Sequence, residues 1–307
     1  MMNSSEVENC LTIQKFCCLA SLMEPHRTII SALNVLLSII ALLGNILIFV
    51  ALLKISSLHP PSKLLFGCLA STDFCVGLIS QPLFVIFIFA PELSKLCYYS
   101  TILTNTIGFI FSGVSLLTVT AISMDRLLAL ILRLRYRQVV TLRRAWVLVV
   151  FFWLFSTGFS ITMLYNRRIA ETIASIIMLL CLVTSIFCYM KIYVTLHLHQ
   201  AQVKTNTSQG KPNETRIPVN VARYRKTVSS ALWVQMTLLA CYLPFAVVTG
   251  LRGVLGLRTA ALHQVHAVTI TFLLLNSTLN PFLYCWKIQD VRRAVKDAIK
   301  KLNCFSG

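Results

Sequence analysis

The chain has 307 residues, of which 57% are hydrophobic and only 12% are charged, and its mean hydropathy is +0.77. A soluble domain carries roughly 25% charged residues, so this composition excludes a soluble globule and a disordered chain. The net charge of +18 still needs an explanation, because strongly basic proteins commonly bind nucleic acid.

Seven stretches almost free of Lys, Arg, Asp and Glu predict membrane-spanning helices: 28–53, 64–90 (interrupted by Asp73), 96–124, 145–166, 172–190, 227–251 and 259–286. Each can cross a hydrocarbon core of about 30 Å as a helix. They lack the two-residue alternation of barrel strands. We therefore expect an all-α membrane protein, a seven-transmembrane helix bundle. Its regions are an N-terminus over 1–27, the bundle over 28–286 and a tail over 287–307.

The basic residues lie mostly on one side of this predicted bundle. The side of the C-terminus has 21 Lys and Arg, and the side of the N-terminus has 7. The positive-inside rule then places the N-terminus outside the cell. The charge is thus explained by topology, with no nucleic acid as partner, and favours contact with anionic inner-leaflet lipids. Asn3 begins a usable glycosylation sequon.

Two of the predicted loops between spans differ clearly in length. The longest loop is cytoplasmic, at about 195–224, and the loop between the fourth and fifth spans is short, from about Asn166 to Glu171.

Asp73 is the charged residue deep within a predicted span. Placing a charge in hydrocarbon costs free energy, so an ionisable residue at this depth indicates a functional site. Polar residues of other spans offer it partners: Ser115, Asn276, Ser277 and Asn280. A carboxylate with hydroxyl and amide oxygens suits a small hard cation, so a sodium site is expected. The alternative is a protonated Asp73 hydrogen-bonded to its neighbours.

Asp125-Arg126 ends the third span, and an ion pair there would hold Arg126 until a partner takes it. Simple snorkelling of Arg126 to the membrane edge is the alternative. Pro82, Pro244 and Pro281 lie inside spans, where each removes a helix hydrogen bond; hinges at the latter two are favoured over plain packing geometry.

Four cysteines face the oxidising side, Cys10, Cys17, Cys18 and Cys97. One or two disulfides among them are expected, with open connectivity.

Each span carries a motif, in this order: Gly44-Asn45, Leu69-Ala70-Ser71-Thr72-Asp73, Asp125-Arg126-Leu127, Trp153-Leu154-Phe155-Ser156, Tyr189-Met190-Lys191-Ile192-Tyr193, Cys241-Tyr242-Leu243-Pro244 and Asn276-Ser277-Thr278-Leu279-Asn280-Pro281-Phe282-Leu283-Tyr284. By these motifs the chain resembles the rhodopsin-like (class A) G protein-coupled receptors over about 28–304. It is loosely similar to their melanocortin, adenosine, cannabinoid and lysophospholipid group.

The resemblance implies a receptor, not an enzyme, that activates heterotrimeric G proteins by an outward swing of the sixth span. It assigns G protein coupling and switching to these residues: Asp125, Arg126, Leu134, Tyr189, Tyr242, Pro244, Pro281 and Tyr284. It gives Asp73 and its polar partners the role of an allosteric sodium site, with no other cofactor.

Departures from the family pattern are informative. Tyr242 replaces the usual Trp, and Cys181 stands where the fifth span usually has a Pro. The start of the sixth span, 223–226, is basic and offers Arg126 no acidic partner, which predicts raised basal activity. The usual third-span Cys is Thr101, so Cys97 is expected to pair with an N-terminal cysteine instead.

The expected ligand pocket is apolar and aromatic with a few polar groups: Asn105, Gly108, Phe111, Tyr242, Phe245 and Thr249. Gly108 occupies the position where amine receptors carry Asp, which disfavours a monoamine. Basic residues around the mouth, including Arg167 and Arg252, are explained by ordinary interfacial anchoring or by an amphiphilic or anionic ligand, such as a lipid mediator or acidic peptide.

The tail over 287–302 has apolar residues at spacings of three and four, which predicts a short amphipathic eighth helix on the inner leaflet. Cys304 follows as a candidate palmitoylation site. The competing functions are a transporter or channel and a receptor-fold binder that does not signal. Against transport, the two halves show no repeat and the buried carboxylate lacks a charged relay.

Overall fold

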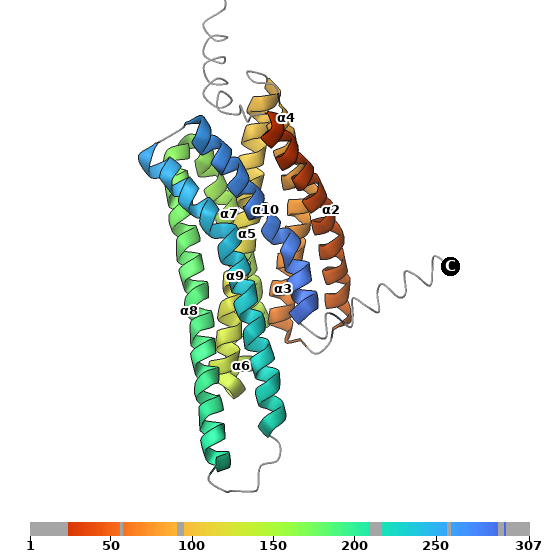
Figure 1. The fold of residues 1–307 in the computed structure, drawn as a ribbon, viewed down its shortest axis with the longest axis vertical. Coiled ribbons are helices and arrows are strands. Elements are labelled where there is room, and N and C mark those ends of the chain that lie inside the picture. Colours follow the sequence, from red (N-terminus) through yellow and green to blue (C-terminus); the bar gives the residue numbers. More distant parts are fainter. Residues whose placement is uncertain are drawn as a thin grey trace, which may run out of the picture.

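The computed structural model describes residues 24–55, 58–90, 95–208, 217–256, 259–287 and 292. Over these ranges the chain forms helices that pack side by side in one bundle, with no strand (Figure 1). The elements are α2 (Glu24–Lys54), α3 (Pro60–Cys75), η1 (Val76–Ser80), α4 (Gln81–Phe89), α5 (Lys95–Leu132), η2 (Arg133–Arg135), α6 (Tyr136–Val139), α7 (Leu142–Tyr165), α8 (Arg167–Ser208), α9 (Ile217–Leu255) and α10 (Ala260–Lys287). The elements α3, η1 and α4 are continuous, and η2 and α6 follow directly on α5. The described helices therefore form seven long segments, which confirms the predicted bundle.

The distribution of side chains fits a hydrocarbon surrounding. Large apolar residues such as Leu43, Val147 and Val183 are exposed on the outside, while Asn45 and Asp73 are buried inside. Six of the described helical segments are long and apolar enough to cross a membrane. The remaining segment, α10, is 28 residues long but carries two histidines and two asparagines, which lower its hydropathy. Its polar residues face the interior that the other helices enclose.

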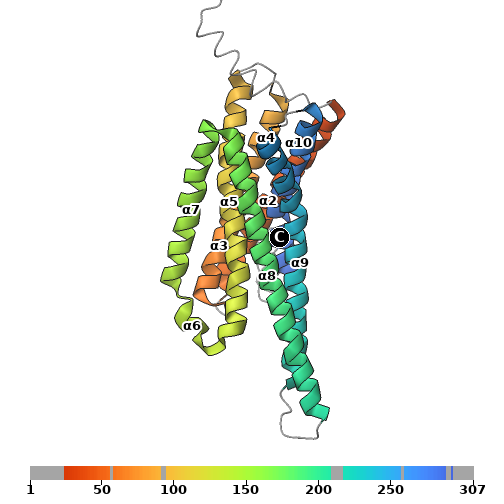
Figure 2. The ribbon, with the colours of Figure 1, turned by 90° about the vertical axis from the view of Figure 1, so that its left-hand side faces the viewer.

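The two ends of the bundle are named the Cys97 end, where α5 begins, and the Tyr136 end, where α6 lies. Helices α8 and α9 extend side by side beyond α6 at the Tyr136 end (Figures 1 and 2). The predicted loop over 195–224 is therefore wrong, since α8 continues to Ser208 and α9 begins at Ile217. Hydropathy registers only the hydrocarbon thickness, whereas a helix satisfies its own backbone hydrogen bonds and can continue into water.

The predicted loop from Asn166 to Glu171 is also wrong, because Asn166 alone separates α7 from α8. Its backbone N–H donates to the Thr162 carbonyl (3.1 Å) and ends α7. Its side-chain Oδ1 accepts from the Ile169 N–H (3.2 Å), which caps the start of α8. One residue therefore closes one helix and opens the next.

Proline shapes the second segment. Pro82 has no N–H, and the preceding turn η1 is wound as a π-helix, in which the N–H five residues on bonds each carbonyl. In that register Pro82 leaves the Gly77 carbonyl without its donor, and the Ser38 hydroxyl supplies one at 2.7 Å. A Cβ at Gly77 would lie 3.1 Å from Ala41 Cβ, so the glycine allows α2 to come this close.

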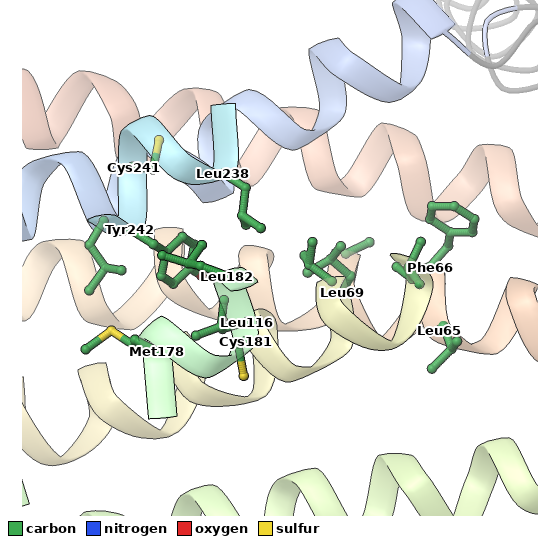
Figure 3. Close-up of a cluster of buried hydrophobic side chains, with 14 of the residues drawn as sticks. Leu65, Phe66, Leu69, Leu116, Met178, Cys181, Leu182, Leu238, Cys241 and Tyr242 are labelled. Carbon is green, nitrogen blue, oxygen red and sulfur yellow. The ribbon is translucent and has the colours of Figure 1, made fainter. Parts of the chain in front are cut away.

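The main apolar core joins the middle of α5, α8 and α9. Tyr242 and Leu238 of α9 gather there with Leu182 of α8 and Leu116 of α5 (Figure 3). The side chain of Tyr242 is almost completely buried. This core separates a cavity at the Cys97 end from the charged groups at the Tyr136 end.

Candidate functional site

Helices α3, α5 and α10 bring four of the predicted sodium ligands together. The Ser115 hydroxyl donates to Asp73 Oδ1 (3.3 Å), and Asn280 Nδ2 donates to Asp73 Oδ2 (2.7 Å). Ser277 also interacts with the Asp73 carboxylate. Asn276 is buried one helical turn before Asn280 on α10, and its Nδ2 has no hydrogen-bond partner in the described part of the chain. A buried carboxylate among hydroxyl and amide groups fits the chemistry of a small hard cation.

The Gly44-Asn45 motif of α2 contacts α10 close to Ser277 and Asn280. Pro281 lacks an N–H, so the Ser277 carbonyl loses its helical partner four residues on. Asn45 Nδ2 donates to that carbonyl at 3.1 Å. A Cβ at Gly44 would lie 2.9 Å from Pro281 Cγ, so Gly44 permits α2 to pack directly against the proline ring. Gly44-Asn45 thus accommodates the Pro281 kink sterically and through a hydrogen bond.

At the Tyr136 end, Asp125 is buried within a network of donors. Arg126 Nη2 lies 2.8 Å from Asp125 Oδ2, which is the predicted pairing. The Ser62 hydroxyl donates to the same oxygen at 2.8 Å, and the Tyr136 hydroxyl donates to Oδ1 at 2.6 Å. The sequence does not indicate Ser62 and Tyr136 as partners, because α3 and α6 approach α5 only in the folded bundle. These bonds fix the carboxylate that holds Arg126.

Arg126 itself is only partly buried. Its side chain is 41% exposed, and the guanidinium lies 5.7 Å from the centre of the Phe66 ring. The pair is therefore anchored on the Asp125 side and accessible on the Arg126 side.

The other predicted switch residues occupy varied positions. Leu134 in η2 is 95% exposed and offers an apolar contact at the Tyr136 end. Tyr189 is buried in α8, where it packs with Ile192 against Leu127 of α5. Pro244 and Pro281 lie inside α9 and α10, as expected. The backbone of Tyr284 is helical, and its side chain lies outside the described residues.

A cavity of about 500 Å³ opens into the bundle at the Cys97 end. Five of the six predicted pocket residues line it: Asn105, Gly108, Tyr242, Phe245 and Thr249. Phe111 does not line it, because its ring packs edge-on against Trp153 with centroids 6.0 Å apart. The buried Tyr242 forms part of the lining and also interacts with Ser115, a partner of Asp73. Tyr242 therefore lies between the cavity and the Asp73 cluster.

A charged group at the cavity was missed in the sequence. Glu171, expected in a loop, is buried on α8 and lines the cavity together with Arg167. Arg167 Nε donates to Glu171 Oε1 at 2.9 Å, and Arg252 Nη2 lies 3.5 Å from the same oxygen. The four-residue spacing of Arg167 and Glu171 would have indicated this pair had a helix been predicted from residue 167.

Cys97 is disulfide-bonded at the start of α5, and its partner lies outside the described residues. The pairing with Cys10, Cys17 or Cys18 stays a prediction. Asn3, the amphipathic eighth helix over 287–302 and Cys304 also lie outside the described residues, apart from Arg292. In the part of the chain that the structure describes, no group of His, Cys, Asp and Glu has the arrangement of a metal site.

The chain matches a known receptor family over most of its length. The family model described as 7 transmembrane receptor (rhodopsin family) matches residues 44–173 and 164–284. The chain belongs to this family. It is therefore a multi-pass plasma-membrane receptor of signal transduction, not an enzyme, and the predicted membership is confirmed.

Individual relatives of this receptor are distant but match over most of their length. Human trace amine-associated receptor 9 is 23% identical, with 94% of this chain and 90% of that protein covered. Rat melanocortin receptor 5 is 24% identical, with 86% and 82% covered. Sheep adenosine receptor A3 is 24% identical, with 84% and 86% covered. The melanocortin and adenosine receptors belong to the group that the sequence resembles.

Proposed function

We propose that this receptor binds an extracellular ligand in the cavity at the Cys97 end and activates a heterotrimeric G protein at the Tyr136 end. The observation that carries the proposal is the Asp125–Arg126 pair, with Asp125 buried among donors and Arg126 accessible from outside the bundle. A partner that binds Arg126 competes with Asp125. Activation then consists of separating this pair while α9 moves outward.

The orientation in this proposal follows from charge. The Tyr136 end faces the cytoplasm, because the segments on that side hold 21 of the 28 Lys and Arg residues. The N-terminus is then extracellular, and the basic side faces anionic inner-leaflet lipids.

Ligand and G protein act on one equilibrium between inactive and active states. Each shifts it by binding one state better than the other. Tyr242 is the residue through which cavity occupancy reaches the centre, because it lines the cavity and interacts with Ser115. The Pro244 position in α9 provides the bend about which the Tyr136 end of that helix swings outward.

The start of α9 offers Arg126 no acidic partner that would stabilise the inactive state. Residues 217–235 of α9 contain no Asp or Glu, so they supply no acidic partner for Arg126. Among the described residues, the ion pair that competes with the G protein for Arg126 is the one with Asp125. We expect measurable activation in the absence of ligand.

Sodium is proposed at Asp73, with Ser115, Asn276, Ser277 and Asn280 as the surrounding polar groups. The support is the convergence of two hydrogen bonds from α5 and α10 on this buried carboxylate. An ion there stabilises the packing of these helices around α3, and so the inactive state.

The proposal is tested by nucleotide exchange on purified G proteins with the receptor in lipid nanodiscs. The wild type should accelerate exchange without ligand. Arg126→Ala should lower that rate to the value of empty nanodiscs, while Lys95→Ala, which removes an exposed charge at the opposite end, should not. Folded receptor that never accelerates exchange would favour a non-signalling binder, and ion flux across receptor vesicles would favour the transporter or channel.

A further inference from the structure

A cluster of charged side chains joins α8 and α9 at the Cys97 end. Glu171 Oε1 accepts from Arg167 Nε (2.9 Å) and lies 3.5 Å from Arg252 Nη2. Arg252 Nη1 also lies 3.4 Å from His263 Nδ1 on α10. The side chains of Glu171 and Arg252 are each only 4% exposed. We call Arg167, Glu171 and Arg252 the arginine–glutamate cluster.

The charges of this cluster favour an anion. Two guanidinium groups and one carboxylate give it one net positive charge. Interactions between charges are stronger in such a buried setting than in water, because the surroundings screen them poorly. A planar guanidinium with several N–H donors also matches the oxygens of a carboxylate or a phosphate.

The space beside the cluster is suited to an apolar body. Arg167 and Glu171 line one part of the cavity, while aromatic and aliphatic residues, among them Phe109, Phe159 and Met178, line most of the rest. A volume of about 500 Å³ lies within the usual range for ligand pockets. The cavity therefore combines a charged end with an apolar interior.

A further polar group lies close to the cluster. Thr249 also lines the cavity and precedes Arg252 by three residues on α9, so both lie on one face of that helix. The Thr249 side chain is fully buried, and its hydroxyl has no hydrogen-bond partner within the described ranges. A buried hydroxyl in this situation gains a hydrogen bond when a ligand oxygen arrives.

One wall of the cavity reaches the outer surface of the bundle. Phe155 and Leu164 of α7 line the cavity, yet they are 38% and 54% exposed. In the membrane this surface meets lipid chains. The apolar side chains that α7 presents at this cavity fit a ligand with an apolar part.

We propose that the ligand class of this receptor is an amphiphile with a carboxylate or phosphate headgroup. The headgroup binds at Arg167 and Thr249, which both line the cavity, and the buried Arg252 adds its positive charge from behind Glu171. The apolar chain fills the aromatic part of the cavity. This inference rests on the proposed function only in taking the cavity as the ligand site.

Binding is measured on the purified full-length receptor in phosphatidylcholine nanodiscs, with a dansyl-labelled twelve-carbon fatty acid as the probe. Unlabelled dodecanoate, dodecyl phosphate, dodecanol and dodecylamine then compete for the site. We expect at least one of the two anions to compete about tenfold or more better than the alcohol and the amine, because a hydrogen bond to a charged group is lost without it. The better of the two identifies the headgroup.

Three variants test the role of the cluster. Arg167→Gln should weaken probe binding by about 10- to 100-fold. Glu171→Gln should leave it equal or tighter, because a carboxylate that competes for the arginines is removed. Arg168→Gln is the matched control, since the Arg168 side chain donates instead to the Gly253 and Val254 carbonyls (2.9 and 2.8 Å).

Several results would overturn the inference. These are equal competition by dodecanol, preference for dodecylamine with loss of binding in Glu171→Gln, equal weakening by Arg167→Gln and Arg168→Gln, and the absence of amphiphile binding while an acidic peptide binds. Arg126→Ala should retain probe binding. Its loss of G protein activation would therefore test the proposed function separately from the ligand class.

Discussion

The hydrogen bond from Asn45 to Ser277 joins α2 to the kink of α10, and its removal gives the sharpest test of the packing. Pro281 deprives the Ser277 carbonyl of its helical donor, and Asn45 Nδ2 replaces that donor at 3.1 Å. Asn45→Ala leaves this buried carbonyl unsatisfied, which costs about 1–3 kcal/mol. In a domain of this size that lowers the melting temperature by roughly 2–10 °C.

The same reasoning predicts that the damage depends on the proline. Pro281→Ala restores an N–H to α10, which then bonds the Ser277 carbonyl within the helix. Asn45→Ala should therefore cost about 1 kcal/mol less in a Pro281→Ala background than in the wild type. The measurement is thermal unfolding of the four proteins of this cycle in detergent.

Asn34→Ala is the matched control for this cycle. Asn34 also donates from α2 to α10, but its acceptor is the Thr271 hydroxyl at 3.0 Å, which no proline has orphaned. Its cost should be the same with and without Pro281. Additive costs for Asn45→Ala and Pro281→Ala would refute the idea that Asn45 compensates for the proline.

Three further outcomes follow from the structure. Replacing choline by sodium at constant ionic strength should raise the melting temperature by a few degrees, and Asp73→Asn should abolish this increase; an equal response in both proteins contradicts the proposed site. Tyr136→Phe removes a 2.6 Å hydrogen bond to Asp125 and should raise ligand-free nucleotide exchange about fivefold or more, because Arg126 is held less firmly; an unchanged rate would contradict a restraining role for the Asp125–Arg126 pair. Cys97→Ser opens a disulfide at the mouth of the bundle and should alter ligand affinity, whereas indifference would show that this bond does not shape the site.

The sequence predicts best what depends on local composition. Runs without charge identify the spans, since any residue in hydrocarbon must be apolar or internally satisfied. Asp73, Ser115 and Asn280 could be grouped because polar residues in such runs have few positions other than the bundle interior. The structure brings them within hydrogen-bonding distance.

The sequence predicts less well what depends on distant partners. The sequence predicts Glu171 to be a loop residue, because this charge directly precedes the apolar stretch 172–190. Its burial depends on Arg252, which lies 81 residues further along the chain, on another helix. Likewise, Ser62 and Tyr136 meet Asp125 only because α3 and α6 pack against the end of α5. Helix ends beyond the membrane were missed for a related reason, since nothing apolar marks them.

The single-residue connection at Asn166 has a mechanical consequence. A longer linker would absorb movement, but in this receptor the same residue ends α7 and caps α8. Any displacement that a ligand imposes on the first turn of α8, where Arg167 and Glu171 lie, is transmitted to the last turn of α7. The two helix ends then move together, so that Leu164 of α7 shifts with Arg167 and Glu171 of α8 at the cavity.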